Sequence, residues 1–501
     1  MIKAIQKQPL FLLLLPVFFV VHGMLENFGF IPFSDAATLC LTYLVATIIL
    51  TALFYLFFRS LTKAALMTSL CMGIFFAFGT LQDFLQAHLH NRFFTRYSIL
   101  LPAILLLLII AFWRIRKTKY TLHRLTGFLN LLLIIYLLVD IGWILVKAIR
   151  PDKEKLSVYA FEEMDQYKTC DTCTKPDIYL LLFDEYASSA SLQERYQYNN
   201  DLDTFLAAKG FAIQPHSRSN YNFTPFSMAS LLNMAYLQGI QNVRAISAED
   251  YARCNELIRH NQVIKFLDLQ GYDIVNYSVF DLAGHPSQVN QSFLPLKTKL
   301  ITDRTLFARI NRDIGWLLSN YFPFSLFASY DILADRHNNN LFIDLTTQAA
   351  TSERKRPAFI YTHLYMPHPL FYYDKDGRER NADTLYQELR SPVAYSTYLD
   401  YISYTNTRIK ELVNTLQQKS PTAVIMIMGD HGFREGGLPL ASPHFFTNFN
   451  AVYLRGKTLV PPSSAVNQFR VVFNELFHQS IPLLKDSCIF LQDKQNRKTD
   501  D

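Results

Sequence analysis

The stretch "PDIYLLLFDEY", residues 176–186, decides the fold of the larger part of this chain. It is a short, nearly continuous apolar run that ends in two acidic residues. A strand that helices cover on both faces of a sheet has this composition, because neither face meets water. The stretch is therefore predicted to be a buried strand of a parallel sheet.

The segments that follow alternate between helical and extended patterns. "DLDTFLAAKGFAIQ" (201–214) and "NQVIKFLDLQGYDIVNYSVF" (261–280) each predict a helix, a glycine stop and then a strand. "PAFIYTHLYMPH" (357–368), "TAVIMIMGDHG" (422–432) and "NAVYLRG" (450–456) are apolar runs followed by polar residues. Regular alternation predicts an α/β domain with a mostly parallel sheet. Ligands of such sheets bind beyond the carboxyl ends of the strands, so the polar residues there are the functional candidates.

Two of these strand ends carry residues that can hold a metal ion. Asp184 and Glu185 end the first stretch, and Asp430 and His431 follow "AVIMIM". A single pair of this kind is more often a helix cap or a structural contact. Together, however, carboxylate oxygens and an imidazole nitrogen suit zinc or manganese, whereas calcium prefers oxygen ligands alone.

A hydroxyl-rich stretch, "NYNFTPFSMASLLNM" (220–234), contains the candidate nucleophile. Thr224 precedes Pro225 and a helix-like pattern, so its hydroxyl could be a helix N-cap. Next to a metal ion, the same hydroxyl could become a nucleophile. We favour the nucleophile, with Ser227 as its competitor one helical turn later. Asn222 is a candidate for substrate binding.

Two histidines lie in "THLYMPHPLFYYD" (362–374). Pro367 and Pro369 restrict the backbone on either side of His368. His363 and His368 are either solvated loop residues or side chains held toward a site, and the local sequence favours neither interpretation.

The first 150 residues have a different composition. They contain apolar segments at 10–31, 36–58, 64–86, 97–113 and 126–147, each close to the roughly 20 residues that a membrane-spanning helix needs. Basic residues precede the first segment and recur in alternate loops, so those loops are predicted to be cytoplasmic. They also account for much of the net charge of +6, which needs no nucleic-acid partner. With five spans, the rest of the chain lies outside the cytoplasm.

The predicted organisation has four parts: a transmembrane domain of five helices at 1–150, a linker at 151–175, a catalytic domain at 176–492 and a disordered tail at 493–501. Cys170 and Cys173 in "CDTC" lie in the linker. A disulfide between them is plausible in an oxidising compartment.

Five spans followed by an extracytoplasmic α/β domain resemble the lipoteichoic acid synthases and lipid A phosphoethanolamine transferases. Both belong to the alkaline phosphatase and sulfatase superfamily, and that fold is expected here. The resemblance implies metal ligation by Glu185, Asp430 and His431 of "DHG", with Asp184 beside them. It makes Thr224 of "TPFSM" both nucleophile and metal ligand, and His368 of "PHP" a substrate-binding residue.

The chain departs from that family at "TNFNAVYL" (447–454), where the transferases usually carry a histidine and this sequence has Asn448. His444 is a candidate substitute. The arginine of the sulfatase signature Cys/Ser-x-Pro-x-Arg is also missing after Thr224 and Pro225, so a formylglycine sulfatase is not expected.

The resemblance implies an enzyme that moves a phospholipid head group, phosphoethanolamine or phosphoglycerol, through a phosphothreonine intermediate to a cell-envelope glycan or lipid. It implies one or two divalent metal ions, zinc or manganese, and a multi-pass protein of the bacterial inner membrane with a periplasmic catalytic domain. The alternatives are a hydrolase on the same fold and a non-catalytic membrane protein with a degenerate domain.

The charge pattern generates a topological prediction. Protease added to intact spheroplasts should remove the domain after residue ~150, because the basic loops place it outside the cytoplasm. Immunoblotting with an antibody to this domain measures the loss. Survival of the domain until the cells are lysed would reverse the topology.

Overall fold

The computed structural model divides into two compact units, Met1–Lys153 with Gln291–Asp331, and Glu154–Asn290 with Ile332–Asp501. We call them the helical unit and the α/β unit. The predicted tail lies outside the described residues from 494 onward. The structure describes residues 8–28, 31–88, 92–149, 157–158, 167–240, 244–246, 248–289, 298–311, 333–381, 384–385, 388, 394–435, 438–439 and 442–493.

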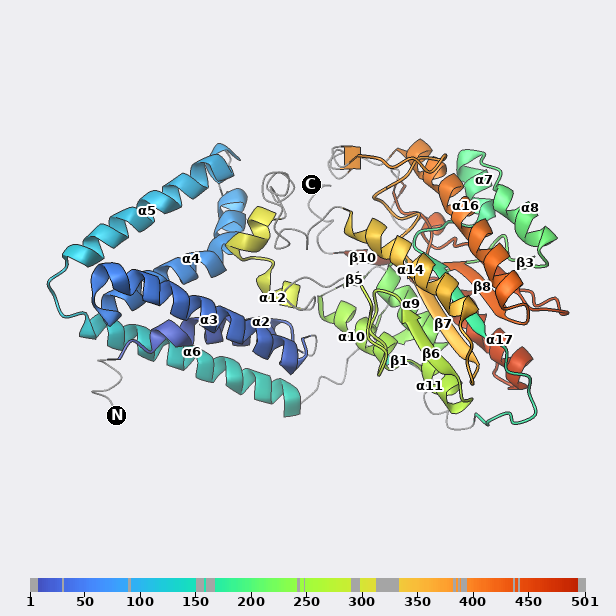
Figure 1. Ribbon diagram of the computed structural model, residues 1–501, viewed down its shortest axis with the longest axis horizontal. Helices are drawn as coiled ribbons and strands as arrows, with labels where there is room; N and C mark the ends of the chain where they lie inside the picture. Colours follow the sequence, from blue (N-terminus) through green and yellow to red (C-terminus); the bar gives the residue numbers. More distant parts are fainter. Residues whose placement is uncertain are drawn as a thin grey trace. The chain divides into compact units, whose positions relative to one another are not determined.

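The helical unit consists of long apolar helices (Figure 1). Its elements are α2 (Phe11–Glu26), α3 (Phe33–Phe58), α4 (Leu61–His88), η1 (Arg92–Thr95), α5 (Tyr97–Lys117), α6 (His123–Ile149) and α12 (Lys299–Thr302). Four of them, α3 to α6, are long and apolar enough to cross a membrane, whereas α2 has 16 residues and is shorter. The fifth span that the sequence predicts corresponds to α2 and stays a prediction.

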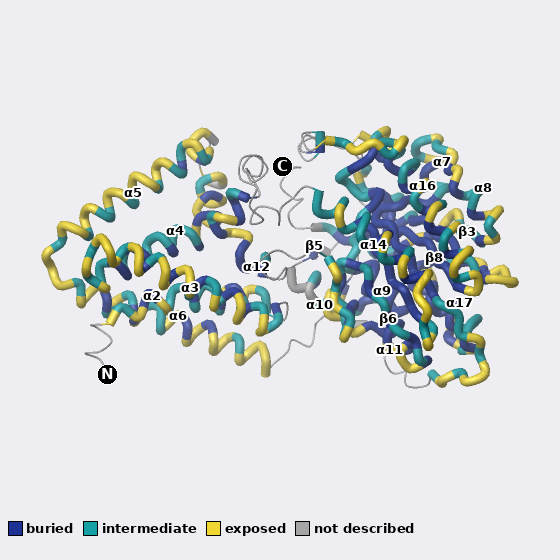
Figure 2. The backbone as a smooth tube through the Cα atoms, in the orientation of Figure 1, coloured by how far each residue is buried: buried dark blue, intermediate teal, exposed yellow. Residues whose placement is uncertain are grey.

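The outer surfaces of these helices are apolar. Leu56, Leu106 and Leu138 are each about three-fifths exposed, and Figure 2 shows exposed residues along α3, α5 and α6. Contiguous exposed apolar surface of this kind is expected of helices that face lipid.

A segment from the middle of the sequence, residues 298–311, packs into the helical unit. Ile301 lies in the same buried cluster as Val20 and Leu39. The Gly79 amide donates to the Arg304 carbonyl at 2.7 Å. Arg309 donates to both carboxylate oxygens of Asp83, at 2.9 and 2.6 Å.

The contact at Gly79 predicts a destabilising substitution. A Cβ at Gly79 would lie 2.6 Å from the Arg304 carbonyl oxygen, whereas a Cβ at Gly73, on the same helix, would meet nothing within 4 Å. Gly79→Ala should therefore cost about 1–3 kcal/mol by overpacking. Gly73→Ala should be neutral or slightly stabilising, because alanine is the better helix former. Thermal unfolding of the purified full-length protein compares the two, and equal melting temperatures would contradict the docking.

The α/β unit is built on a six-stranded sheet with the order β3-β9-β8-β2-β7-β6. The strands are β2 (Ile178–Phe183), β3 (Ala212–Ile213), β6 (Asp273–Tyr277), β7 (Ala358–Leu364), β8 (Val424–Gly429) and β9 (Asn450–Tyr453). β2 runs parallel to both neighbours, β7 and β8, and β6 runs parallel to β7, whereas β9 is antiparallel to β8 and β3. The predicted α/β domain with a mostly parallel sheet is confirmed.

Both faces of the sheet are covered. Ile178, Leu180 and Leu182 of β2 join one buried cluster, and Tyr179 and Phe183 join the other. This explains the continuous apolar run, since alternate side chains point into two cores. The first cluster includes α9 (Thr224–Asn233), α10 (Ala248–Arg259), α11 (Gln262–Leu269) and α17 (Gln468–Phe477); the second includes α7 (Ser189–Tyr196), α8 (Asp201–Ala208), α14 (Ala334–Thr351) and α16 (Tyr395–Lys419).

Short elements complete the unit. Cys170 and Cys173 form a disulfide, as the sequence suggested. The remaining elements are two strand pairs, β1 (Ser157–Val158) with β4 (Leu237–Gln238) and β5 (Arg244–Ile246) with β10 (Leu491–Asp493), and the short helices η5 (Pro443–Phe445) and η6 (Ala465–Asn467).

Candidate functional site

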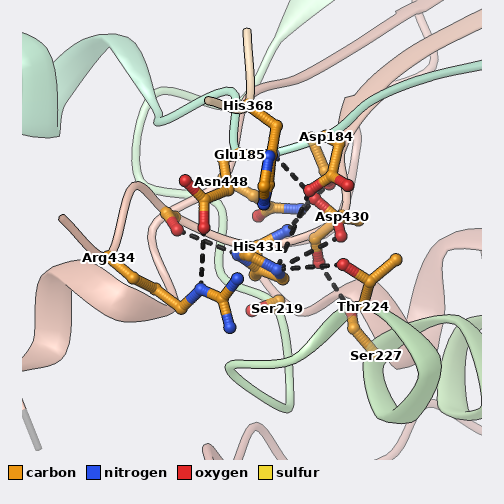
Figure 3. A network of polar contacts seen from close by, with 12 residues as sticks. Asp184, Glu185, Ser219, Thr224, Ser227, His368, Asp430, His431, Arg434 and Asn448 are labelled. Atoms are coloured by element: carbon orange, nitrogen blue, oxygen red, sulfur yellow. Dashed lines mark hydrogen bonds and ion pairs between the residues drawn. The ribbon is translucent and has the colours of Figure 1, made fainter. Parts of the chain in front are cut away.

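The carboxyl ends of β2 and β8 lie side by side, because Phe183 is in register with Gly429. The residues that follow the two strands therefore meet, although the sequence separates them widely. Asp184, Asp430 and His431 are buried, and each offers a ligand atom within 4.8 Å of the others. We call these three residues the ligand cluster (Figure 3).

The backbone around the ligand cluster is tightly constrained. One carboxylate oxygen of Asp430, Oδ1, accepts from the amides of Glu185 at 2.9 Å and His431 at 2.8 Å. Glu185 has a φ of 58°, in the left-handed region, which costs a non-glycine residue about 1–2 kcal/mol. A Cβ at Gly429 would lie 2.3 Å from the Tyr186 carbonyl oxygen, and one at Gly432 would lie 2.0 Å from that of His444. The glycines that flank "DH" are therefore required by close backbone approach.

The protonation of His431 shows that the ligand cluster fits a cation. Nδ1 lies 2.9 Å from the Gly432 carbonyl oxygen, and since a carbonyl only accepts, Nδ1 carries the proton. The lone pair of Nε2 then lies 3.3 Å from Asp430 Oδ2 and 3.9 Å from Asp184 Oδ1. Asp430 Oδ2 and both carboxylate oxygens of Asp184 are buried without a hydrogen-bond partner. Unpaired acceptors that face one another are repulsive unless a positive charge lies between them.

The pKa shifts agree with this interpretation. Burial raises the pKa of Asp184 well above its ordinary value, and the Asp430 and Glu185 carboxylates raise it further. Burial also disfavours the charge of Asp430, but His431, His363 and the hydrogen bonds that Asp430 accepts hold its pKa below the ordinary value. A bound divalent cation would favour the charged form of both carboxylates.

Thr224 lies next to the ligand cluster. It is the first residue of α9, and its Oγ1 lies 3.2 Å from His431 Nε2. The N-cap residue is Phe223, and no side chain caps this helix. The Ser227 hydroxyl, by contrast, donates to the Asp430 carbonyl at 2.6 Å. The structure therefore directs the Thr224 hydroxyl to the ligand cluster and engages Ser227 with the backbone.

Glu185 has a partner that the sequence analysis missed. Its Oε1 accepts from Arg434 Nε at 2.7 Å, while its Oε2 is buried without a partner. The only sequence signal for Arg434 is its place two residues after the glycine of "DHG" in "DHGFRE", and nothing local shows that it reaches back to β2.

Two of the predicted histidines lie near these residues. His363 is buried on β7, with Nδ1 at 3.0 Å from the Tyr361 hydroxyl and Nε2 without a partner. Burial lowers its pKa to about 4, so it is neutral at physiological pH. His368 donates from Nδ1 to the Pro369 carbonyl, and Figure 3 shows its ring beside Glu185 and Asp184.

Two other candidates, His444 and Asn222, and also Asn448, which replaces the family's histidine, have partners of their own. The His444 imidazole hydrogen-bonds with the Ser191 hydroxyl on α7 at 3.0 Å. Asn448 accepts from the Ser217 hydroxyl at 2.9 Å and donates to the Gly429 carbonyl at 2.6 Å. The Asn222 amide pairs with both backbone groups of Leu491, at 3.0 and 2.8 Å. Those contacts do not bring His444 or Asn222 to the ligand cluster, whereas Asn448 lies in the same polar network (Figure 3) and is bonded there to backbone and to Ser217.

Comparisons with known proteins place the α/β unit in a family. The model of the Sulfatase family matches residues 165–460, and no curated protein sequence matches the chain.

Several solved structures are similar to the chain at low identity. The C-terminal periplasmic domain of EcEptC from Escherichia coli, in complex with zinc, is 10% identical with a TM-score of 0.36, and the match covers 62% of this chain and 84% of that one. The periplasmic domain of phosphoethanolamine transferase EptC from Campylobacter jejuni is 13% identical with a TM-score of 0.36, covering 62% and 92%. Ps i-CgsB, in complex with k-i-k-neocarrahexaose, is 14% identical with a TM-score of 0.38, covering 63% and 75%. Values this low carry no information about activity.

The ligand cluster generates a prediction about metal content. The purified full-length protein should carry about one zinc or manganese ion, since the unpartnered oxygens and the Nε2 lone pair converge on one point. Elemental analysis should show its loss in an Asp430→Ala, His431→Ala double variant. His444→Ala is the matched control, because that imidazole bonds to Ser191, and it should keep the metal. Full occupancy in the double variant would exclude the assignment.

Proposed function

This chain belongs to the sulfatase family and is an enzyme of that superfamily, and we propose that it transfers a phospholipid head group through a covalent intermediate on Thr224. The observation that carries the proposal is the 3.2 Å contact between Thr224 Oγ1 and His431 Nε2, beside carboxylate oxygens that have no other partner. A hydroxyl in such a place is available for activation as a nucleophile.

The residues present fit a divalent metal ion, zinc or manganese. Asp184, Asp430 and His431 would hold it, and Thr224 and the free Oε2 of Glu185 are further candidate ligands. When bound, the ion would lower the pKa of the hydroxyl and neutralise charge on the phosphoryl oxygens.

In the first half-reaction, Thr224 Oγ1 loses its proton to water and forms a bond to the phosphorus of the donor lipid. The bond from phosphorus to the diacylglycerol oxygen breaks, and that oxygen takes up a proton. His368 in its doubly protonated form is the candidate donor of this proton, because Nδ1 is engaged with Pro369 and the proton on Nε2 is then the one available to the substrate. His363, neutral at physiological pH, is less suited to this role.

In the second half-reaction, a hydroxyl of the acceptor glycan or lipid attacks the same phosphorus and gives up its proton. The bond to Thr224 Oγ1 breaks and the threonine regains a proton. The N-terminus of α9, which begins at Thr224, favours negative charge at the phosphoryl group in both steps through the helix dipole.

The proposed location follows from the two units. Helices long and apolar enough to cross a membrane would hold the α/β unit near lipid head groups, on the periplasmic side of a bacterial inner membrane. The runner-up function is hydrolysis, in which water replaces the acceptor in the second half-reaction. A non-catalytic role is disfavoured by the Thr224–His431 contact, which a degenerate site would not need to keep.

Substitution of Thr224 tests the proposal. Thr224→Ala should abolish head-group transfer, because the group must be held covalently between the two half-reactions. Thr224→Ser should keep some activity, since it keeps the hydroxyl. Mass spectrometry of the protein after incubation with membrane phospholipids should show an adduct on Thr224.

Two further variants separate the nucleophile from a structural hydroxyl. Thr224→Asn should be inactive, although asparagine is a good helix cap. Ser227→Ala should reduce turnover modestly at most, since that hydroxyl bonds to a backbone carbonyl. Full turnover in Thr224→Ala, with loss in Ser227→Ala, would show that the nucleophile is misassigned.

A further inference from the structure

Arg434 is held close to the ligand cluster by contacts with two different parts of the chain (Figure 3). Its Nε donates to Glu185 Oε1 at 2.7 Å, directly after β2. Its guanidinium carbon lies 4.8 Å from the ring centre of Phe223, the residue before Thr224. A guanidinium group stacked on an aromatic ring and bound at one edge has little freedom to rotate. Figure 3 shows it directed toward the space between Glu185 and His431.

The other edge of this guanidinium group is open. Among the residues that the structure describes, Glu185 is the only hydrogen-bond partner of Arg434, and it takes Nε alone. The two terminal nitrogens, Nη1 and Nη2, are not among the buried atoms without a partner, and 23% of the side chain is exposed. These donors therefore reach solvent at the site.

An arginine with a structural role looks different in the same unit. Arg470 is buried, and all three of its nitrogens are bonded to the backbone: Nε and Nη2 to the Met234 carbonyl, at 2.8 and 2.6 Å, and Nη1 to the Pro482 carbonyl. In Arg434, by contrast, Nη1 and Nη2 have no hydrogen-bond partner among the described residues. Two parallel donors of this kind match the oxygens of a phosphate or carboxylate.

The charges of the site are compatible with an anion at this position once a divalent ion is bound. Asp184, Glu185 and Asp430 contribute three carboxylates against one guanidinium group, so a single divalent ion would bring the site to neutrality. An arriving phosphoryl group then meets no uncompensated carboxylate.

Asn448 supplies no positive charge to the site. It stands where the family resemblance predicts a histidine, and its side chain is engaged with Ser217 and Gly429.

We propose that Arg434 binds the non-bridging oxygens of the phosphoryl group that Thr224 receives, through Nη1 and Nη2. This inference rests on the proposed function for the identity of the anion. Glu185 and Phe223 hold the guanidinium group in place before the substrate arrives, so no reorganisation is needed when negative charge develops at phosphorus.

Anion binding can be measured without turnover. The full-length, zinc-loaded protein in lipid nanodiscs is titrated calorimetrically with inorganic phosphate, and zinc content is measured in parallel. Arg434→Gln should weaken phosphate binding by roughly 10- to 100-fold, the range for hydrogen bonds to charged groups, with about one zinc retained. Arg434→Lys should lie between, because it keeps the charge but loses the paired donors.

Arg195→Gln is the matched control. Arg195 is also partly buried, stacks 4.6 Å from the Tyr196 ring centre and donates to the Phe433 carbonyl at 3.2 Å, one residue before Arg434. It does not contact Asp184, Asp430 or His431, so its loss should leave phosphate affinity unchanged.

Three results would overturn the inference: no phosphate binding by the zinc-loaded wild type, unchanged affinity in Arg434→Gln at full zinc content, or loss of zinc in that variant. The last would make Arg434 a positioning residue for Glu185. Arg434-dependent phosphate binding without any adduct on Thr224 would instead refute the proposed function and leave the inference standing.

Discussion

Burial of ionisable groups at the shared end of β2 and β8 is the constraint on which the site depends. Asp184, Glu185, Asp430 and His431 are all within 2% of complete burial, where an unpaired charge is expensive. Three of these groups are compensated, each differently, whereas both carboxylate oxygens of Asp184 have no hydrogen-bond partner in the described part of the chain. Asp430 uses one oxygen for two backbone amides, Glu185 uses one oxygen for Arg434, and His431 donates to a carbonyl. The remaining atoms of Asp184, Asp430 and His431 lie within 4.8 Å of one another, which explains why a cation fits there.

The same constraint explains the irregular backbone around the site. The left-handed Glu185 and the tight approaches at Gly429 and Gly432 are local costs that regular packing would avoid. They are sustained by the sheet, because β2 pairs with a strand on each side and is buried along its whole length. A rigid sheet with a strained edge is the usual arrangement at a functional site, where position matters more than local stability.

The α9 helix brings the Thr224 hydroxyl to this edge. Phe226 and Met228 of this helix belong to one of the two buried clusters that cover the sheet. This packing fixes the position of Thr224 relative to the ligand cluster. The Ser227 hydroxyl donates to the Asp430 carbonyl, and this bond connects the first turn of the helix to the backbone of the ligand cluster. The proposed nucleophile and the ligand cluster are thus positioned by one continuous network.

Sequence alone determined the features that depend on local composition. The sequence predicted the continuous apolar run of β2, the helix-to-strand alternation and the apolar helices of the first 150 residues, because neighbouring residues determine burial and periodicity. It also singled out Asp184, Asp430, His431 and Thr224 as candidates, and the structure brings these four residues together. Tertiary structure alone decided how those groups pair. Glu185 and Asp430 are 245 residues apart, and nothing local shows that Arg434 occupies an oxygen of Glu185, that Asn448 and Asn222 bind backbone, or that His444 is held by Ser191. The docking of residues 298–311 into the helical unit was likewise absent from the sequence-based domain limits. Many side chains can form hydrogen bonds, so the sequence does not show which ones pair. The pairs form only after folding, when the sheet brings particular loops within bonding distance.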